Sequence, residues 1–263
     1  MPELPEVERY RTLLGAAALG RPVTEVVAPD AWYLKRGTSV AELRAALVGR
    51  RLVAARRRGK LLLAEVEGAP DAPVLGLRFG MSGRLLVDDA AGVDRLLYAP
   101  AGDDARYDRF GLRFADGGVL RVSDPRRLGG VELDPDVDAL GPDALTVTAR
   151  RLGAALAGSA PLKARLLDQA RVAGIGNLVA DEALWRAGLA PGRAAGGLDG
   201  AEVALLAAAV RSTLRLLIGR GGSHTGDLMP ERRPGGHCPR DGAELRRATI
   251  GGRTSWWCPT HQR

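Results

Sequence analysis

The chain opens with the sequence MPELPEVE, in which removal of Met1 would leave a free proline amine beside a carboxylate. An α-amino group has a pKa of about 7.7–8.0 and lysine one of about 10.4, so the α-amino group is far more deprotonated near neutrality. Such an amine can attack a carbonyl or a sugar C1′, and a proline nitrogen then gives a cationic iminium that drives elimination. Pro2 is therefore a candidate nucleophile, with Glu3 as the acid or base beside it.

The same residues also allow a purely structural interpretation. Proline is favoured in the first turn of a helix, and carboxylates near the N-terminus complement the helix dipole. In this interpretation Pro2 and Pro5 only shape a helix start that Glu3 and Glu6 stabilise.

A second group of reactive residues lies near the end of the chain. The only cysteines, Cys238 and Cys258, are each followed at the third position by another possible ligand, Asp241 and His261. The pattern Cys-x2-Asp-x16-Cys-x2-His has the spacing of a four-ligand zinc ribbon, although His237 is an alternative to Asp241. We predict a structural zinc ion with no open position for activating water. The alternative is a metal-free hairpin packed through its tryptophans.

The formal net charge of +7 favours a polyanionic partner. Almost all of the basic charge is arginine, because the only lysines are Lys35, Lys60 and Lys163. Lysine can give up a proton and arginine cannot. Lys60, at the end of the run RRRGK that precedes an apolar strand, is therefore a candidate acid or base. The run itself is expected to face phosphate or solvent.

Three short segments have residues that suit nucleic acid. The turn 173–177 (AGIGN) before a helix would present unpaired N–H groups to an anion, with Asn177 as a further donor, or it is a helix connector with an asparagine cap. Met81 lies in the turn 80–83 (GMSG), and the loop 124–128 (DPRRL) protrudes in the same way. Proteins that kink DNA insert apolar wedges with an arginine where a base has been extruded.

The rest of the chain supplies the elements that position these groups. We predict a strand-rich domain at 1–133, a linker at 134–147, a helical domain at 148–219, and a loop with a hairpin at 220–263. No apolar run is long enough to span a membrane and no secretion signal is evident, so a soluble cytoplasmic protein is expected. The predicted strands are Val23–Ala28, Leu61–Val66, Val74–Phe79, Arg84–Val87, Gly111–Phe114, Val119–Val122, Leu245–Ile250 and Arg253–Trp257. The predicted helices are a first one from Leu4, then Val40–Val48, Thr148–Ala157, Leu162–Gln169, Leu178–Ala187 and about Leu198–Ile218.

Taken together and in this order, the motifs PELPE, RGK, GMSG, DPRR, GIGN and the terminal ribbon resemble the formamidopyrimidine-DNA glycosylase / endonuclease VIII family over the whole chain. The resemblance implies an α+β fold with an N-terminal β-sandwich flanked by helices and a C-terminal helix-two-turn-helix domain with a zinc β-ribbon. DNA would lie in the cleft between them. It also implies a monomeric, nucleoid-associated bacterial enzyme of base-excision repair. Its expected activities on damaged or abasic double-stranded DNA are those of a DNA glycosylase and an AP lyase that performs β,δ-elimination.

The resemblance also assigns roles to individual residues. Pro2 would be the nucleophile, Glu3 the acid or base, and Lys60 a phosphate contact that transfers protons. The remaining expected DNA contacts are Met81, Arg126 and Leu128 as void-filling residues, Asn177 and Arg253 as phosphate contacts, and Glu6, Arg78 and Lys163.

The chain departs from the family pattern in ways that bear on substrate choice. Leu128 replaces a frequent phenylalanine wedge, Arg78 stands where a histidine is common, and Asp241 and His261 replace two cysteines. The segment Gly219–Gly236 is too short for the loop that covers 8-oxoguanine. This favours an endonuclease VIII-like preference for oxidised pyrimidines or ring-opened purines. The alternatives are a damage-recognising protein with little or no catalysis, and a glycosylase for alkylated or cross-linked bases.

Overall fold

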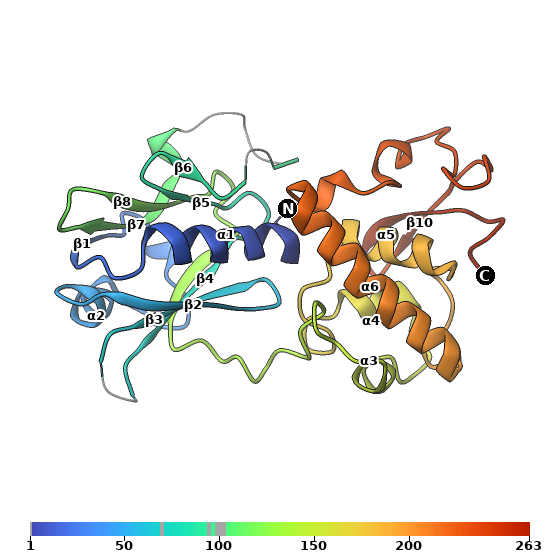
Figure 1. The fold of residues 1–263 in the computed structure, drawn as a ribbon, viewed down its shortest axis with the longest axis horizontal. Coiled ribbons are helices and arrows are strands. Elements are labelled where there is room, and N and C mark those ends of the chain that lie inside the picture. The colour runs from blue at the N-terminus through green and yellow to red at the C-terminus, as the bar shows by residue number, and fades with distance from the viewer. Residues whose placement is uncertain (1, 69–70, 94–95, 98–103) are drawn as a thin grey trace. The chain divides into compact units, whose positions relative to one another are not determined.

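The computed structural model describes residues 2–68, 71–93, 96–97 and 104–263 (Figure 1). Their contacts form two compact units. The first contains Pro2 and Glu6–Val137, and the second contains Glu3–Pro5 and Asp138–Arg263. The change of unit after Val137 falls within the segment that the sequence predicts as a linker.

The first unit is built on two antiparallel sheets, one of five strands in the order β1-β7-β8-β5-β6 and one of four in the order β2-β3-β4-β9. Two α-helices and two short 3-10 helices accompany them. The strands of the five-stranded sheet are β1 (Val23–Val27), β5 (Arg84–Val87), β6 (Ala90–Ala91), β7 (Asp108–Phe114) and β8 (Val119–Ser123). Those of the other sheet are β2 (Leu52–Arg58), β3 (Leu61–Val66), β4 (Val74–Arg78) and β9 (Gly130–Leu133). The helices are α1 (Leu4–Ala17), η1 (Ala31–Tyr33), α2 (Val40–Leu47) and η2 (Ala105–Tyr107).

Helix α1 completes the core of the first unit. Its apolar residues recur at helical spacing, so Val7, Tyr10 and Leu14 share one face and are fully buried with the inward side chains of both sheets. The Tyr10 hydroxyl donates to the Gly83 carbonyl at 3.0 Å, and its ring lies 4.5 Å from that of Phe79. Burial raises the pKa of Tyr10 well above its usual value.

The second unit is mainly helical. Its own apolar core is formed by the inner faces of its α-helices, and a separate small cluster packs beneath the terminal hairpin. The longest helix, α6, begins with a capping box between Asp199 and Glu202 and ends at Gly221, whose φ is +101°. The elements are α3 (Ala149–Ala155), α4 (Leu162–Leu167), α5 (Asn177–Ala187), η3 (Ala195–Gly197), α6 (Gly200–Arg220), η4 (Ser223–Thr225), η5 (Met229–Glu231), β10 (Arg246–Ile250) and β11 (Arg253–Trp257).

The predicted fold class is confirmed, but strands β2, β6 and β9 of the strand-rich half were not predicted. The run RRRGK does precede the apolar strand β3, but its arginines themselves end strand β2, and Gly59-Lys60 forms the two-residue turn between the two strands. Strand β2 is an edge strand on which Arg56 stays exposed, while the buried side chain of Arg57 is paired with Glu8, so a basic run fits there at little cost. Gly59 has a φ of +58°, which suits this tight turn.

No helix in the described part of the chain combines the length and the apolar character that crossing a membrane requires.

Candidate active site and metal centre

The carboxylate of Glu3 is bound at the N-terminus of α5. It is almost fully buried, at 1% exposure, and its two oxygens accept hydrogen bonds from the N–H groups of Leu178 and Val179, at 2.9 and 3.0 Å. A helix N-terminus favours an anion because its first N–H groups have no partner within the helix. The turn before α5 therefore binds an anion, as its sequence suggested, but the anion is the chain's own Glu3.

Gly176 permits this close approach. A Cβ atom built at this position would lie 2.2 Å from Cδ of Glu3, so any larger residue would displace the carboxylate. The N–H group of Leu4 also donates to the Gly174 carbonyl at 3.2 Å. Glu3 and Leu4, which directly follow Pro2, are thus both fixed to the turn before α5. Glu3 is held through its side chain and Leu4 through its backbone.

Asn177 is the first residue of α5 and is not its cap, a position that Gly176 occupies. The side chain of Asn177 is half-buried, and its Oδ1 accepts no hydrogen bond from the residues that the structure describes. The phosphate-binding role expected for Asn177 stays a prediction. Arg253, at the start of β11, is exposed and donates only to the neighbouring Gly252 carbonyl, at 3.2 Å, in the described contacts.

Lys60 lies in the β2–β3 turn and is half-buried. The turn is held by Arg57, which donates to the Gly59 carbonyl at 2.8 Å and pairs with Glu8 at the same distance. Only 6% of the Arg57 side chain is exposed. Arg57 is therefore a structural residue that positions the turn, and the proton-transferring role of Lys60 stays a prediction.

The turn 80–83 and the loop 124–129 are locked together by one buried carboxylate. Asp124 is fully buried and accepts from the Ser82 hydroxyl at 2.5 Å and from the Gly129 N–H group at 2.8 Å. Gly80 has a φ of +54°, and a Cβ there would lie 2.3 Å from the backbone of Leu128. These contacts fix the two segments that carry the predicted wedge residues.

The wedge residues themselves reach the surface to different degrees. Leu128 is 53% exposed, Arg126 is also exposed, and Met81 is half-buried. Single exposed apolar side chains are common at protein surfaces, so the exposure of Leu128 alone assigns it no role. The insertion role of the three residues stays a prediction.

Two residues that were expected to contact DNA are engaged elsewhere in this structure. The Glu6 carboxylate is 1% exposed in the first turn of α1, so a direct contact with DNA is not supported for it. Arg78 pairs with Glu132 at 2.7 Å, and the same buried Glu132 also pairs with Arg36 at 3.0 Å. The Arg78 side chain keeps 37% exposure, so its DNA contact stays a prediction.

The expectation that Lys163 contacts DNA directly is not supported either. Its side chain is completely buried and its ammonium group lies 2.6 Å from the Asp181 carboxylate. It donates to the Ser255 hydroxyl at 2.8 Å and to the Thr254 carbonyl at 3.0 Å. The other oxygen of Asp181 accepts from Arg232 at 2.7 Å.

Burial lowers the pKa of Lys163, while Asp181 opposes that shift. The network joins α4, α5 and β11, so Lys163 positions the hairpin that carries the exposed arginine at its turn.

Lys163→Met should lower the free energy of unfolding by about 1–3 kcal/mol, because Asp181 loses one buried partner while Arg232 still compensates part of its charge. Denaturant unfolding measures the loss. The exposed Arg246, on β10 of the same hairpin, provides a matched control, and Arg246→Met should change the stability by less than about 0.5 kcal/mol. Equal effects of the two substitutions would show that the buried network does not stabilise the second unit.

Sequence analysis missed the acidic pair Asp181-Glu182, although two adjacent carboxylates in a mainly apolar helix indicate that at least one of them has a buried partner. Glu182 is 3% exposed and accepts from the N–H groups of Asp227 and Leu228 at 3.1 and 2.9 Å. Gly226 allows this, because a Cβ there would lie 2.5 Å from a Glu182 oxygen. The short segment between α6 and the hairpin is therefore anchored to α5.

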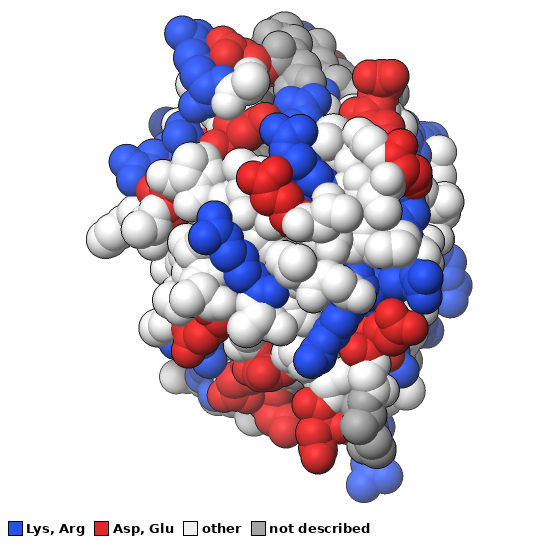
Figure 2. Space-filling model, turned by 90° about the vertical axis from the view of Figure 1, so that its left-hand side faces the viewer, with Lys and Arg blue, Asp and Glu red and all other residues white. Residues whose placement is uncertain are grey.

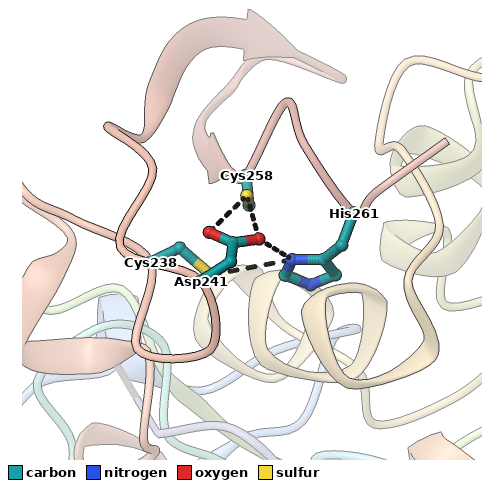
Figure 3. A group of neighbouring side chains, drawn as sticks. All are labelled: Cys238, Asp241, Cys258 and His261. Atoms are coloured by element: carbon teal, nitrogen blue, oxygen red, sulfur yellow. Dashed lines mark hydrogen bonds and ion pairs between the residues drawn. The ribbon is translucent and has the colours of Figure 1, made fainter.

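The four predicted metal ligands converge at the base of the hairpin (Figure 3). One ligand atom from each of Cys238, Asp241, Cys258 and His261 lies within 4.8 Å of all the others. Asp241 accepts from Cys258 at 3.2 Å and lies 3.0 Å from His261 Nδ1, while Cys238 Sγ lies 3.6 Å from the same nitrogen. His237 is exposed and outside the cluster, so the structure selects Asp241 as the fourth candidate ligand.

The surroundings of this cluster orient its two sulfur atoms and its imidazole ring. The N–H groups of Arg240 and Thr260 each point at the cysteine sulfur two residues earlier, at 3.4 Å. His261 Nε2 lies 3.2 Å from the Trp185 carbonyl, which leaves Nδ1 to face the cluster. Such outer partners fix the tautomer and the orientation of a ligating histidine. The donor set can hold a divalent metal ion.

The net charge does not measure how many arginines can reach phosphate. Figure 2 shows a face on which basic and acidic side chains alternate among uncharged ones, without a continuous basic patch. Many of the arginines are in ion pairs, as Arg21 is with Asp88 and Asp116 at 2.9 and 2.8 Å. Phosphate contacts must therefore be assigned residue by residue.

Two family models match the chain, the formamidopyrimidine-DNA glycosylase N-terminal domain over residues 1–131 and the H2TH domain of the same enzymes over residues 139–228. Formamidopyrimidine-DNA glycosylases of Paracoccus denitrificans and Stenotrophomonas maltophilia (strain R551-3) are 38% and 37% identical to it, over the full length of both chains in each case. Among solved structures, Lactococcus lactis Fpg in complex with abasic-site DNA superposes with a TM-score of 0.82 at 27% identity, covering 99% of each chain. The same enzyme with DNA containing an oxidised pyrimidine gives a TM-score of 0.81 at 27% identity over the whole of both chains.

Proposed function

Because the chain belongs to the formamidopyrimidine-DNA glycosylase family, we propose that it excises oxidised bases from damaged double-stranded DNA and then cleaves the abasic strand. The observation that carries the proposal is the placement of Glu3. Its carboxylate is fixed by two backbone N–H groups. Glu3 directly follows Pro2, so the proposed proton carrier is held next to the proposed nucleophile. We further propose that the protein acts as a monomer in the bacterial nucleoid.

The proposed reaction begins once Met1 has been removed. The Pro2 nitrogen attacks C1′ of the damaged nucleotide, the bond from C1′ to the base breaks, and the departing base takes a proton from solvent. The Glu3 carboxylate accepts the proton that the Pro2 nitrogen loses and passes it to the ring oxygen as the deoxyribose opens, which gives an iminium between Pro2 and C1′. Loss of a C2′ proton then expels the 3′ phosphate, and a second elimination expels the 5′ phosphate.

The other predicted residues act on the DNA in this proposal. Lys60 contacts a phosphate and transfers protons, and Asn177 and Arg253 bind phosphates beside the flipped nucleotide. Met81, Arg126 and Leu128 fill the space that the base leaves, which lowers the cost of extrusion. Lys163 is assigned no DNA contact, and it acts by holding β11 in position.

We propose that the metal centre holds a structural Zn2+ ion. Two thiolates, one imidazole and one carboxylate fit its tetrahedral preference, and all four positions would be taken by protein ligands. Zinc would fix the two ends of the hairpin and with them the strand that carries Arg253.

His261→Ala should abolish stoichiometric zinc in the purified protein and lower its melting temperature, because a structural zinc ion contributes directly to folding. Metal analysis of the purified protein gives the zinc content. His237→Ala is the matched control and should retain a full equivalent of zinc, since His237 lies outside the cluster. Loss of zinc in His237→Ala with retention in His261→Ala would reverse the ligand assignment.

For lesion choice we propose an endonuclease VIII-like preference for oxidised pyrimidines and ring-opened purines. The short segment between α6 and the hairpin, whose backbone is anchored on Glu182, supports this preference. The relatives named above are formamidopyrimidine-DNA glycosylases, so this preference rests on the segment alone.

A cleavage panel tests the function and the preference together. Duplexes with 8-oxoguanine, formamidopyrimidine, thymine glycol, dihydrouracil or an abasic site should all be compared with undamaged DNA. We expect cleavage of the abasic and ring-opened duplexes and slow release of 8-oxoguanine. Binding to the damaged duplexes without cleavage by protein lacking Met1 would instead favour a damage-recognising protein, and fast release of 8-oxoguanine would overturn the preference.

A further inference from the structure

Trp32 is the most exposed of the large apolar side chains in the described part of the chain, at 68% exposure. The other tryptophans are buried or half-buried. Its exposure is not the result of a loose loop. The backbone N–H group of Trp32 donates to the Asp30 carboxylate at 3.2 Å, and the next residue, Tyr33, is fully buried in the core. The backbone therefore holds the indole outward at a fixed place.

That place adjoins the loop 124–129. The Asp30 carboxylate, which caps the helix of Trp32, is bound by two nitrogens of Arg127 at 2.6 and 2.7 Å. Arg127 lowers the pKa of Asp30, so the pair stays charged. Three residues after Trp32, the N–H group of Lys35 donates to the Val131 carbonyl at 2.8 Å. Trp32 and the segment that presents Arg126 and Leu128 thus form one rigid surface within the first unit.

The chemistry of this surface matches a nucleotide. The ammonium group of Lys35 lies 4.7 Å from the centre of the indole ring and donates to the Trp32 carbonyl at 2.6 Å. An exposed aromatic ring with a cation over it suits a base or sugar together with a phosphate, because bases stack on aromatic rings and cations neutralise the backbone. Leu128, the exposed wedge of the adjoining loop, has no aromatic face.

We propose that Trp32 is a DNA contact of the lesion-recognition surface, where its indole packs against a nucleotide of the duplex engaged by Arg126 and Leu128. Lys35 binds a neighbouring phosphate, and Asp30 is a positioning residue that holds the indole beside the loop. This inference rests on the proposed function. It gives the surface the aromatic contact that a leucine wedge cannot provide.

Binding of the full chain to a duplex with a stable tetrahydrofuran abasic site tests the proposal, with an undamaged duplex as reference. We expect Trp32→Ala to weaken binding by about fivefold or more, the lower end of the effect of losing one base stack. Trp32→Phe keeps an aromatic face and should lose less. Val53→Ala is the control, since it truncates an apolar side chain in the same unit that is also about half exposed, and it should leave affinity within twofold.

A second readout keeps the test decisive if Trp32→Ala is unstable. Indole fluorescence of the wild type should change when the duplex is added, and most of that change should disappear in Trp32→Phe. Lys35→Met should reduce the slope of log K against log salt by about one phosphate contact. Unchanged affinity in Trp32→Ala, an unchanged fluorescence response in Trp32→Phe, or an effect on self-association alone would overturn the proposal. If the wild type itself failed to bind the duplex, the proposed function would fail instead.

Discussion

Protein that retains Met1 should form no covalent complex with an abasic duplex under borohydride, whereas protein that begins at Pro2 should be trapped. The retained methionine turns the Pro2 nitrogen into an amide, which has no basic lone pair for attack on C1′. Strand cleavage should fall by on the order of 10³-fold or more, as expected when a covalent nucleophile is lost. Intact mass measurement identifies the two forms, and gel analysis of reduced mixtures counts the complexes.

The control for this experiment is binding. Both forms should bind the tetrahydrofuran duplex with similar affinity, so that the difference between them is chemical. Pro2→Gly adds a further comparison, because a glycine amine gives a neutral imine that must be protonated before it can drive elimination. Its cleavage should be slower and its trapped complex scarcer than in the wild type. A normal trapped complex from protein whose first residue is Met1 would falsify the assignment of Pro2.

Glu3→Gln should reduce base excision by about 10²- to 10⁴-fold, the usual range for loss of a positioned acid or base. The substitution keeps the size of the side chain, and the amide oxygen can still accept one of the two bonds from Leu178 and Val179. The defect should be much smaller on a preformed abasic site, where the sugar already opens without help. The ratio of excision to abasic cleavage is therefore the informative measurement.

Gly176→Ala is the matched positional test for the same carboxylate. It leaves the chemistry of Glu3 intact but places a Cβ where the carboxylate lies. It should therefore lower the rate of base excision, as Glu3→Gln does. Glu244→Gln removes an exposed carboxylate from the hairpin and should change neither activity. A Glu3→Gln enzyme that excised bases at the wild-type rate would remove Glu3 from the mechanism, even if Pro2 were still trapped.

We expect the buried and the surface basic residues of this protein to have different roles despite similar chemistry. Lys163 and Arg57 are buried and fix a hairpin and a turn, whereas Lys35 and Arg126 belong to the proposed DNA surface. A substitution at a buried cation should therefore appear first in stability. One at the surface should appear first in affinity and its salt dependence.

The sequence by itself determined the local elements and the chemical groups. Alternating and helical periodicities fixed β3 and β5 at their observed bounds, and the turn at Gly251-Gly252 defined the terminal hairpin, because these features depend on neighbouring residues only. The order of short motifs along the chain also identified the family. Strand β2 was missed, since an edge strand can carry arginines that resemble a loop.

Only the tertiary structure decided which partner each of these groups meets. It placed Glu3 on the N-terminus of α5, buried Lys163 against Asp181, selected Asp241 over His237, and set Trp32 beside the loop 124–129. Each of these contacts either joins residues that are distant in sequence or depends on which side chain points into the protein. Neither property can be derived from neighbouring residues alone. Periodicity gives the face of an element, but the register and packing between elements determine what that face contacts.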